Sequence, residues 1–191
     1  MVQAARAVFA VEGYAGTTLD AIALRLGIRK ASLFHHFSSK EALYAGAVLS
    51  LVEELEGVLA ESIAEGPYLE RLDRLGVALT RHLAAHPEAA ALLLRELGGP
   101  APDAAAPPRR AVDALRLAVA FVQYGVDSGA LPPQDAVQLT LSIVGLHLVW
   151  FAVPEVTGPL RGGDPFAPEA VEERAKAVRR QVRRICGVSE G

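Results

Sequence analysis

The spacing of apolar residues along the chain predicts a succession of helices. Apolar side chains recur every three or four positions, the period of one helix face, through residues 2–12, 19–26, 29–36 and 39–64. The same period marks the later predicted helices, which are 68–85, 88–97, 109–128, 136–153 and a last helix from Pro168. No convincing strand pattern interrupts them. The sequence therefore predicts an all-α protein.

Residues with strong positional preferences mark the ends of these helices. Thr18 and Ser39 stand where an N-cap is needed, because their hydroxyls accept from backbone N–H groups of the first turn. Gly13 and Gly27 follow the preceding apolar runs and are expected to end them. Two stretches rich in Gly and Pro predict loops, at 98–108 (GGPAPDAAAPP) and 154–166 (PEVTGPLRGGDPF).

Two of the short predicted helices, 19–26 and 29–36, have the dimensions of a helix-turn-helix with its corner at Gly27. Seven residues are expected to pack this corner from inside: Leu19, Ile22, Ala23, Leu26, Ile28, Leu33 and Phe37. A recognition helix needs donors that reach base edges, with cations and hydroxyls around it for phosphates. The second helix presents such groups outward. We therefore expect a DNA-binding domain over residues 1–46 and a larger helical domain over 47–191.

Composition and charge narrow the classes of protein. The chain has 191 residues, is 51% hydrophobic and 21% charged, and contains one Cys, so it can build a core but no internal disulfide. A reducing cytoplasm fits this composition. The net charge of −3 argues against indiscriminate nucleic-acid binding. Residues 1–46, however, carry five Lys or Arg against three Asp or Glu, so the predicted DNA-binding domain is locally basic.

Residues 17–43 resemble the helix-turn-helix of the TetR family of transcriptional regulators. That family typically reads T-T-x-x-x-I-A-x-x-A-G-V-S-x-G-x-L-Y-x-H-F-x-x-K-E-x-L. The chain matches it at Thr17, Thr18, Ile22, Ala23, Gly27, Ile28, Leu33, His36, Phe37, Lys40, Glu41 and Leu43. It departs at Leu26, Arg29, Ala31 and Phe34, which replace the usual Ala, Ser, Gly and Tyr. The family Tyr commonly gives its hydroxyl to a phosphate, and Phe34 has none.

The resemblance implies roles for residues of this segment. Thr18 is expected at phosphate on a helix N-terminus, Lys40 on phosphate, and His36 beside the DNA backbone. Lys30, Ser32 and His35 are expected near bases. The expected DNA-binding set is Thr17, Thr18, Arg29, Lys30, Ser32, Phe34, His35, His36 and Lys40. Arg29 and Lys30 carry the most weight, because a cation gains most from phosphate or guanine.

The last predicted helix carries apolar residues at alternating spacings of four and three, an a/d seam. The helix 136–153 is apolar on nearly every face. Two such helices from each subunit could form the four-helix interface of a homodimer. The expected interface is Leu141, Val144, Leu148, Val171, Ala175, Val178, Val182 and Ile185. The alternative is a monomer that packs both helices on its own core.

Family members usually bind a small molecule in the larger domain. Polar and aromatic residues set among aliphatic ones are the candidates here. They are Leu92, Arg95, Phe121, Tyr124, His147, Trp150 and Phe151, each of which could instead be plain core. The resemblance implies a ligand-responsive transcriptional regulator, expected to be a repressor. It would bind a palindromic double-stranded DNA operator as a homodimer and be released by a small hydrophobic effector.

The sequence lacks the motifs of the common enzyme classes. We expect no enzyme and no cofactor, because the chain has no G-x-S-x-G motif and no Gly-rich phosphate loop after a strand. His82 and His86, at i and i+4, could ligate a metal, yet residue 83 is Leu where H-E-x-x-H has Glu, and Pro87 ends the helix. No metal is therefore expected.

Two further alternatives concern the partners of the chain. Residues 136–154 contain no Asp, Glu, Lys or Arg and are long enough to imitate a membrane span. They include polar residues and have no basic flank, so burial in protein is expected rather than contact with a membrane. The alternative to the regulator is a helical dimer that binds a ligand or protein without sequence-specific DNA recognition.

Overall fold

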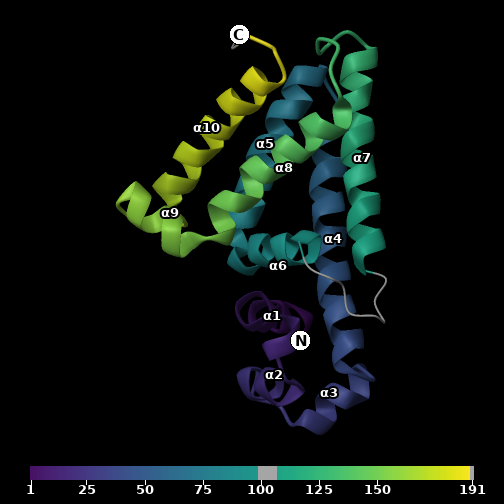
Figure 1. Cartoon of the computed structure of the whole chain (residues 1–191), viewed down its shortest axis with the longest axis vertical. Helices are drawn as coiled ribbons and strands as arrows, with labels where there is room; N and C mark the ends of the chain where they lie inside the picture. Colours follow the sequence, from purple (N-terminus) through teal and green to yellow (C-terminus); the bar gives the residue numbers. More distant parts are fainter. Residues whose placement is uncertain (99–106, 190–191) are drawn as a thin grey trace.

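A computed structural model describes residues 1–98 and 107–189, which form ten helices and no strand (Figure 1). The helices are α1 (Val2–Gly16), α2 (Leu19–Leu26), α3 (Lys30–His36), α4 (Lys40–Ile63), α5 (Tyr68–Ala85), α6 (Pro87–Gly98), α7 (Pro107–Asp127), α8 (Ala136–Ala152), α9 (Pro154–Arg161) and α10 (Pro168–Ile185). The all-α prediction is confirmed. Most of the loop predicted over 98–108 falls on 99–106, outside the described residues.

Three of the predicted helix ends are confirmed. The end predicted at Gly13 is not, because α1 continues to Gly16, although Gly13 itself has a non-helical φ of 71°. The Thr18 hydroxyl accepts from Ala21 N at 3.1 Å and caps α2. The Ser39 hydroxyl does the same for α4, accepting from Ala42 N at 3.2 Å. Gly27 ends α2 in the left-handed region, at φ 64°, which a residue with a Cβ adopts only at a cost. These contacts fix the corner between α2 and α3.

One predicted loop is wrong. Residues 154–166 were expected to be irregular, but α9 occupies Pro154–Arg161. Gly158 and Pro159 read as helix breakers in the sequence. Pro154, however, is at the first helical position, where a backbone N–H would make no hydrogen bond within the helix, so its absence costs nothing. The turn of α9 is closed by Gly162 at φ 79°.

The helices are arranged in two tiers joined by α4 (Figure 1). Helices α1, α2 and α3 gather at the N-terminal end of α4, while α5, α7, α8 and α10 surround its other end. At 24 residues α4 is about 36 Å long, enough to run through both tiers. Helix α6 lies crosswise between them. Two groups of buried apolar residues follow this division, one around α1, α4 and α6 and one between α5, α7 and α10.

The apolar seam of α10 lies inside the protomer, against α5, which corrects the expectation that it would form a dimer interface. Ala175, Val178 and Val182 are 2%, 0% and 3% exposed. Arg183 donates to both carboxylate oxygens of Asp73 on α5, at 2.7 and 3.0 Å. The heptad spacing shows that one face of the helix is covered, and the covering helix belongs to the same chain.

The other expected interface residues divide between core and surface. Leu148 is 6% exposed, and Val144 and Val171 are partly covered. Leu141 and Ile185 remain on the surface, at 53% and 43% exposed.

Helix α8 is covered on one side within this chain. Val137 and Val149, on the same exposed face as Leu141, are 52% and 53% exposed. Among the described residues, no single helix is long and apolar enough to cross a membrane. Helices α8 and α9, bent by 83° at their junction, pass that test together on length and composition.

Candidate nucleic-acid interface

The corner between α2 and α3 is packed as the sequence predicts. Ile22, Ala23 and Leu33 are 0%, 4% and 1% exposed and join the core cluster of the lower tier. The other four expected corner residues are half-buried and pack against the same cluster: Leu19, Leu26, Ile28 and Phe37. Burial of these side chains holds α3 against α2 and leaves its opposite face open to solvent.

Helix α3 presents a row of polar side chains to solvent. It is described in full, and it buries one side chain, that of Leu33. Five of the expected contact residues around it are exposed: Arg29, Lys30, Ser32, His35 and His36. Phe34, at the position where the family usually has Tyr, is 48% exposed. This face carries the donors and cations that a recognition helix needs.

The two basic residues expected to matter most differ in their surroundings. Lys30 Nζ lies 2.6 Å from Asp20 Oδ2 on α2, with both side chains largely exposed. A pair of this kind contributes little to stability and can exchange its partner for a phosphate. The side chain of Arg29, at the N-cap of α3, makes no hydrogen bond or ion pair with any described residue. Its guanidinium is therefore already available to a ligand.

Two expected DNA contacts are instead used inside the fold. Thr17 is 1% exposed, and its hydroxyl donates to Gly13 O at 2.7 Å. Lys40 Nζ donates to the carbonyls of Tyr14 and Thr17, at 2.8 and 3.0 Å, and lies 4.3 Å from the centre of the Tyr14 ring. The structure thus corrects both expectations. Thr17 is buried, and Lys40 binds the carbonyl end of α1, where a cation is favoured.

The remaining expected contacts keep the required exposure. Thr18 is exposed, and its hydroxyl oxygen accepts from Ala21 N, which leaves its proton for an outside acceptor. His35 and His36 lie edge to face, with ring centres 5.4 Å apart. Both rings stand at the end of α3 nearest to α4.

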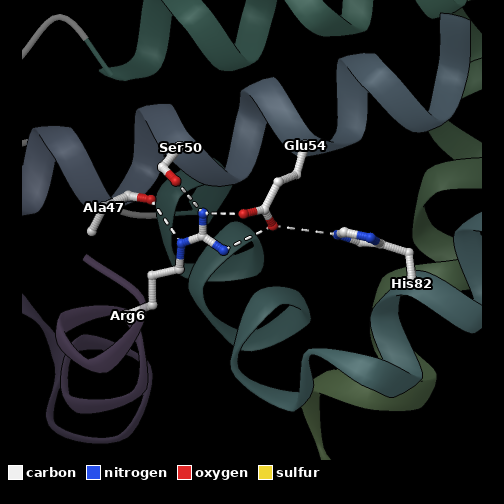
Figure 2. Close-up of polar contacts among 5 residues, drawn as sticks. All are labelled: Arg6, Ala47, Ser50, Glu54 and His82. Atoms are coloured by element: carbon white, nitrogen blue, oxygen red, sulfur yellow. Dashed lines mark hydrogen bonds and ion pairs between the residues drawn. The ribbon is translucent and has the colours of Figure 1, made fainter. Parts of the chain in front are cut away.

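A buried Arg fastens α1 to the middle of α4 (Figure 2). The Arg6 side chain is 0% exposed and donates to Ala47 O, Ser50 Oγ and both carboxylate oxygens of Glu54, at 3.3, 2.5, 2.8 and 2.9 Å. The hydrogen bonds from Arg6 lower the pKa of Glu54. Sequence reasoning missed this pair, because Arg6 lies within an apolar run and its partner is 48 residues away.

Helix α6 provides a second link between the tiers. Arg95 donates to the carbonyls of Ala10 and Val11 in α1, at 3.1 and 3.3 Å. The Tyr44 hydroxyl of α4 donates to buried Glu96 at 2.6 Å. Arg95 was expected in the ligand site, but its side chain, which comes from α6, instead bonds to α1.

An apolar cavity of about 140 Å³, partly open to solvent, lies between α4, α5, α6, α7 and α8. Aliphatic side chains make up most of its wall, including Leu55, Leu79, Leu93 and Leu97. Two titratable residues reach it, Glu56 and His147. Of the seven residues expected to bind an effector, His147 lines this cavity, and the aliphatic wall could not be identified from aromatic and polar signals.

Five other expected effector residues lie elsewhere. Leu92 is 1% exposed in the core, and Phe121 stacks on Tyr68, with ring centres 4.8 Å apart. Tyr124 is 53% exposed, and Trp150 lies under the Arg174 guanidinium at 4.5 Å. Phe151, like Arg95, borders an open groove of about 1120 Å³ along α1, α6 and the start of α9. The wall of this groove is partly polar, whereas the wall of the smaller cavity is almost wholly apolar.

His147 is the polar group best placed at the cavity. Its side chain is 3% exposed, with Nδ1 2.8 Å from Ile143 O and Nε2 3.2 Å from Gly76 O. Burial lowers the pKa of His147, against the two carbonyl contacts, which raise it. The neutral ring carries one proton, so one of its nitrogens faces a carbonyl without donating to it.

Comparison with known proteins agrees with this geometry. The profile of the family described as "Bacterial regulatory proteins, tetR family" matches residues 1–47. The biofilm operon icaADBC HTH-type negative transcriptional regulator IcaR of Staphylococcus aureus (strain Newman) is 43% identical over 51 residues, 27% of either chain. The HTH-type transcriptional repressor AcnR of Corynebacterium diphtheriae is 34% identical over 88 residues, which are 46% of this chain and 40% of that protein.

The sequence matches cover part of these relatives, and the fold match covers nearly the whole chain. The chain spans about a quarter of the length of the IcaR proteins that it matches. The structure of the ketosteroid transcriptional regulator KstR2 of Mycobacterium tuberculosis aligns with a TM-score of 0.72 at 21% identity, over 100% of this chain and 93% of that one. Residues 1–47 therefore match the family of tetR bacterial regulatory proteins, and the whole chain shares its fold with KstR2.

Proposed function

We propose that the chain is a transcriptional repressor that binds a palindromic operator as a homodimer and is released by a small hydrophobic effector. The observation that carries this proposal is the solvent-facing row of five polar residues, four on α3 and one at its N-cap, on a helix that buries one Leu. Residues 1–46 would bind DNA, and residues 47–191 would bind the effector and the second subunit. The boundary falls inside α4, so one continuous helix belongs to both domains.

The direct contacts would come from the exposed residues of and around α3. Arg29 and Lys30, at the N-terminal end of α3, are the residues we expect to reach guanine or phosphate. Thr18, Ser32, His35 and His36 would add hydrogen bonds to the backbone and bases. A single α3 reads few base pairs, so two copies about one helical turn apart are needed for a palindrome.

The second subunit would dock on the outward face of α8. Val137, Leu141 and Val149 form an apolar row there, each slightly more than half exposed. Ile185, at the end of α10, and Leu160, on α9, are 43% and 83% exposed. A contiguous exposed apolar row is the kind of surface that a second subunit would cover. This face replaces the buried α10 seam as the proposed dimer contact.

The effector would occupy the cavity beside His147. Its volume of about 140 Å³ is similar to that of engineered apolar cavities, about 150 Å³, that bind benzene. An aromatic ring or a short acyl chain fits this wall, with one polar group directed to His147 or Glu56. A charged or sugar-like effector would leave its polar groups without partners there.

Helix α6 offers a route from effector to DNA. Leu93 and Leu97 line the cavity, while Arg95 on the same helix donates to the carbonyls of Ala10 and Val11 in α1. An effector that displaces α6 would therefore move α1, and with it α2 and α3. For the effector to change DNA affinity, it must bind the two arrangements unequally.

Selection of genomic fragments on the purified protein, in moderate salt, tests the proposal. Recovery of a palindromic fragment would establish a sequence-specific regulator, and the genes beside it would narrow the effector to a pathway. Recovery of nothing above background, with and without candidate effectors, would contradict the assignment and favour a helical module that does not read DNA.

A further inference from the structure

Three side chains with metal-binding atoms, none of which lines the apolar cavity, converge between α4 and α5. They are Glu54 on α4 with His82 and His86 at the end of α5. One ligand atom from each lies within 4.8 Å of the other two. His82 Nε2 is 3.7 Å from Glu54 Oε2, as Figure 2 shows. All three side chains are half-buried, so solvent and ions can still reach them.

The His82 ring lacks the hydrogen bond that a buried nitrogen normally makes. Its Nε2 is buried and, across the described residues, has no hydrogen-bond partner. Such an atom requires an explanation, and one explanation is an ion. Burial and then the nearby His86 lower the pKa of His82, so the ring is neutral near pH 7 and its lone pair can bind a metal. The two imidazole rings are 4.6 Å apart.

Arg6 holds the carboxylate in place for this role. It donates to both oxygens of Glu54 and is itself fixed by Ala47 O and Ser50 Oγ. A carboxylate has about four lone-pair positions, so Oε2 keeps one that can point at His82. Hydrogen bonds of this kind commonly orient metal-binding carboxylates. The positive charge of Arg6 works against a cation, whereas the negative charge of Glu88 near His82 works for it.

We propose that Glu54, His82 and His86 bind one divalent transition-metal ion of the Zn²⁺ type, with water in the remaining position. Two imidazoles and one carboxylate are typical ligands of zinc, whereas Mg²⁺ and Ca²⁺ prefer oxygen alone. Around tetrahedral zinc the ligand atoms stand roughly 3.3–3.5 Å apart. His82 Nε2 and Glu54 Oε2, 3.7 Å apart, need a shift of a few tenths of an ångström, and since all pairs lie within 4.8 Å, no pair must close by more than roughly 1.4 Å.

The test is a titration of the metal-free full-length chain with Zn²⁺ against a chromophoric chelator, repeated with Co²⁺ for its absorption bands. We expect one equivalent of either ion per chain. His82→Gln and His86→Gln should each weaken the affinity at least tenfold. The matched control is His35→Gln with His36→Gln, which removes the other neighbouring His pair and should leave this stoichiometry and affinity unchanged.

Thermal melting shows whether each variant is folded. The His variants are preferred to Glu54→Gln, because that substitution would leave Arg6 buried without its counter-charge and destabilise the fold. Without metal, His86→Gln should melt with the wild-type chain, because it removes a half-buried ring at the helix end. The same concentration of Zn²⁺ should raise the Tm of the wild-type chain by more than that of His86→Gln. The proposal would be overturned if the wild-type chain failed to bind one equivalent of Zn²⁺, or if both His variants bound it with the affinity of the wild-type chain.

Discussion

Helices α3 and α10 each bury one apolar face. In α3 this leaves a polar face that we assign to DNA, whereas in α10 it removes the face that was expected to contact a second subunit. In α3, Leu33 points inward, and the outward polar row is the surface we assign to DNA. In α10, Val178 and Val182 also point inward, yet their spacing suggested a contact with a second subunit. The amphipathic pattern identifies a covered face in each case, but it does not say which chain covers it.

The contrast has a physical basis. A seven-residue α3 is too short to be stable alone and must bury its Leu on the adjacent α2, a contact close in sequence. An 18-residue α10 can cover its apolar face with any partner of matching shape. Here α5 of the same chain is that partner, held by the Arg183–Asp73 pair. The experiments below test this difference between a short helix and a long one.

The largest expected effect comes from a charge placed in the α10 core. Val178→Asp puts a carboxylate at a position that is 0% exposed, with no counter-charge designed for it. We expect the free energy of unfolding to fall by about 4 kcal/mol or more, measured by urea denaturation. If the variant were instead as stable as the wild-type chain and only dissociated into monomers, the α10 seam would be part of the dimer interface.

A truncation beneath α3 should come next in size. Leu33→Ala removes a side chain that is 1% exposed, and we expect a loss of about 2–4 kcal/mol, with faster hydrogen exchange in α2 and α3. Phe34→Ala, its half-exposed neighbour, is the matched control and should cost less than about 1 kcal/mol. Equal losses in the two variants would mean that α3 is packed on a different face.

Substitution on the outward face of α8 should change assembly rather than folding. Leu141→Asp alters a side chain that is 53% exposed, so the Tm at high dilution should stay near that of the wild-type chain. Sedimentation should show a dimer for the wild-type chain and a monomer for the variant, because an unpaired carboxylate would be buried on association. An unchanged dimer would exclude this face of α8 as the contact.

The smallest expected effect is a pH dependence from His147. Burial lowers its pKa in the folded protein, whereas the unfolded chain takes up the proton near the ordinary value of about 6.5. Stability is therefore complete above about pH 6.5 and falls as the pH drops below it, toward the folded pKa. Between pH 7.5 and 5.5, His147→Asn should lose less stability than the wild-type chain. Parallel pH profiles would show that His147 is not buried as a neutral ring.

The parts of the fold that sequence could predict are those fixed by near neighbours. Thr18, Gly27 and Ser39 define helix ends by contacts within three or four residues, and the corner core follows from the helical period. The α9 helix was missed because Gly and Pro dominate its local signal. The links between tiers were missed for a different reason. Arg6 with Glu54, and Arg95 with the end of α1, join residues 48 to 85 positions apart.

The same limit applies to the site residues. Exposure of Arg29, Ser32 and His35 follows from the period of α3, but internal use of Lys40 and Thr17 depends on how α1 meets α4. The cavity wall is aliphatic, and aliphatic residues carry no signal that separates a binding wall from ordinary core. The proposed metal ligands likewise required Glu54, whose place beside His82 is set by packing of α4 on α5.

The most direct test of the central claim is the salt-dependent affinity of the selected fragment for the wild-type chain and for a variant carrying Arg29→Ala and Lys30→Ala. Each good base contact is worth about 1–3 kcal/mol, so we expect the variant to bind well over tenfold more weakly. Its affinity should also depend less steeply on salt, because two cations are gone. Equal affinity and an equal salt slope in the two proteins would contradict the assignment of α3 as the DNA-reading surface.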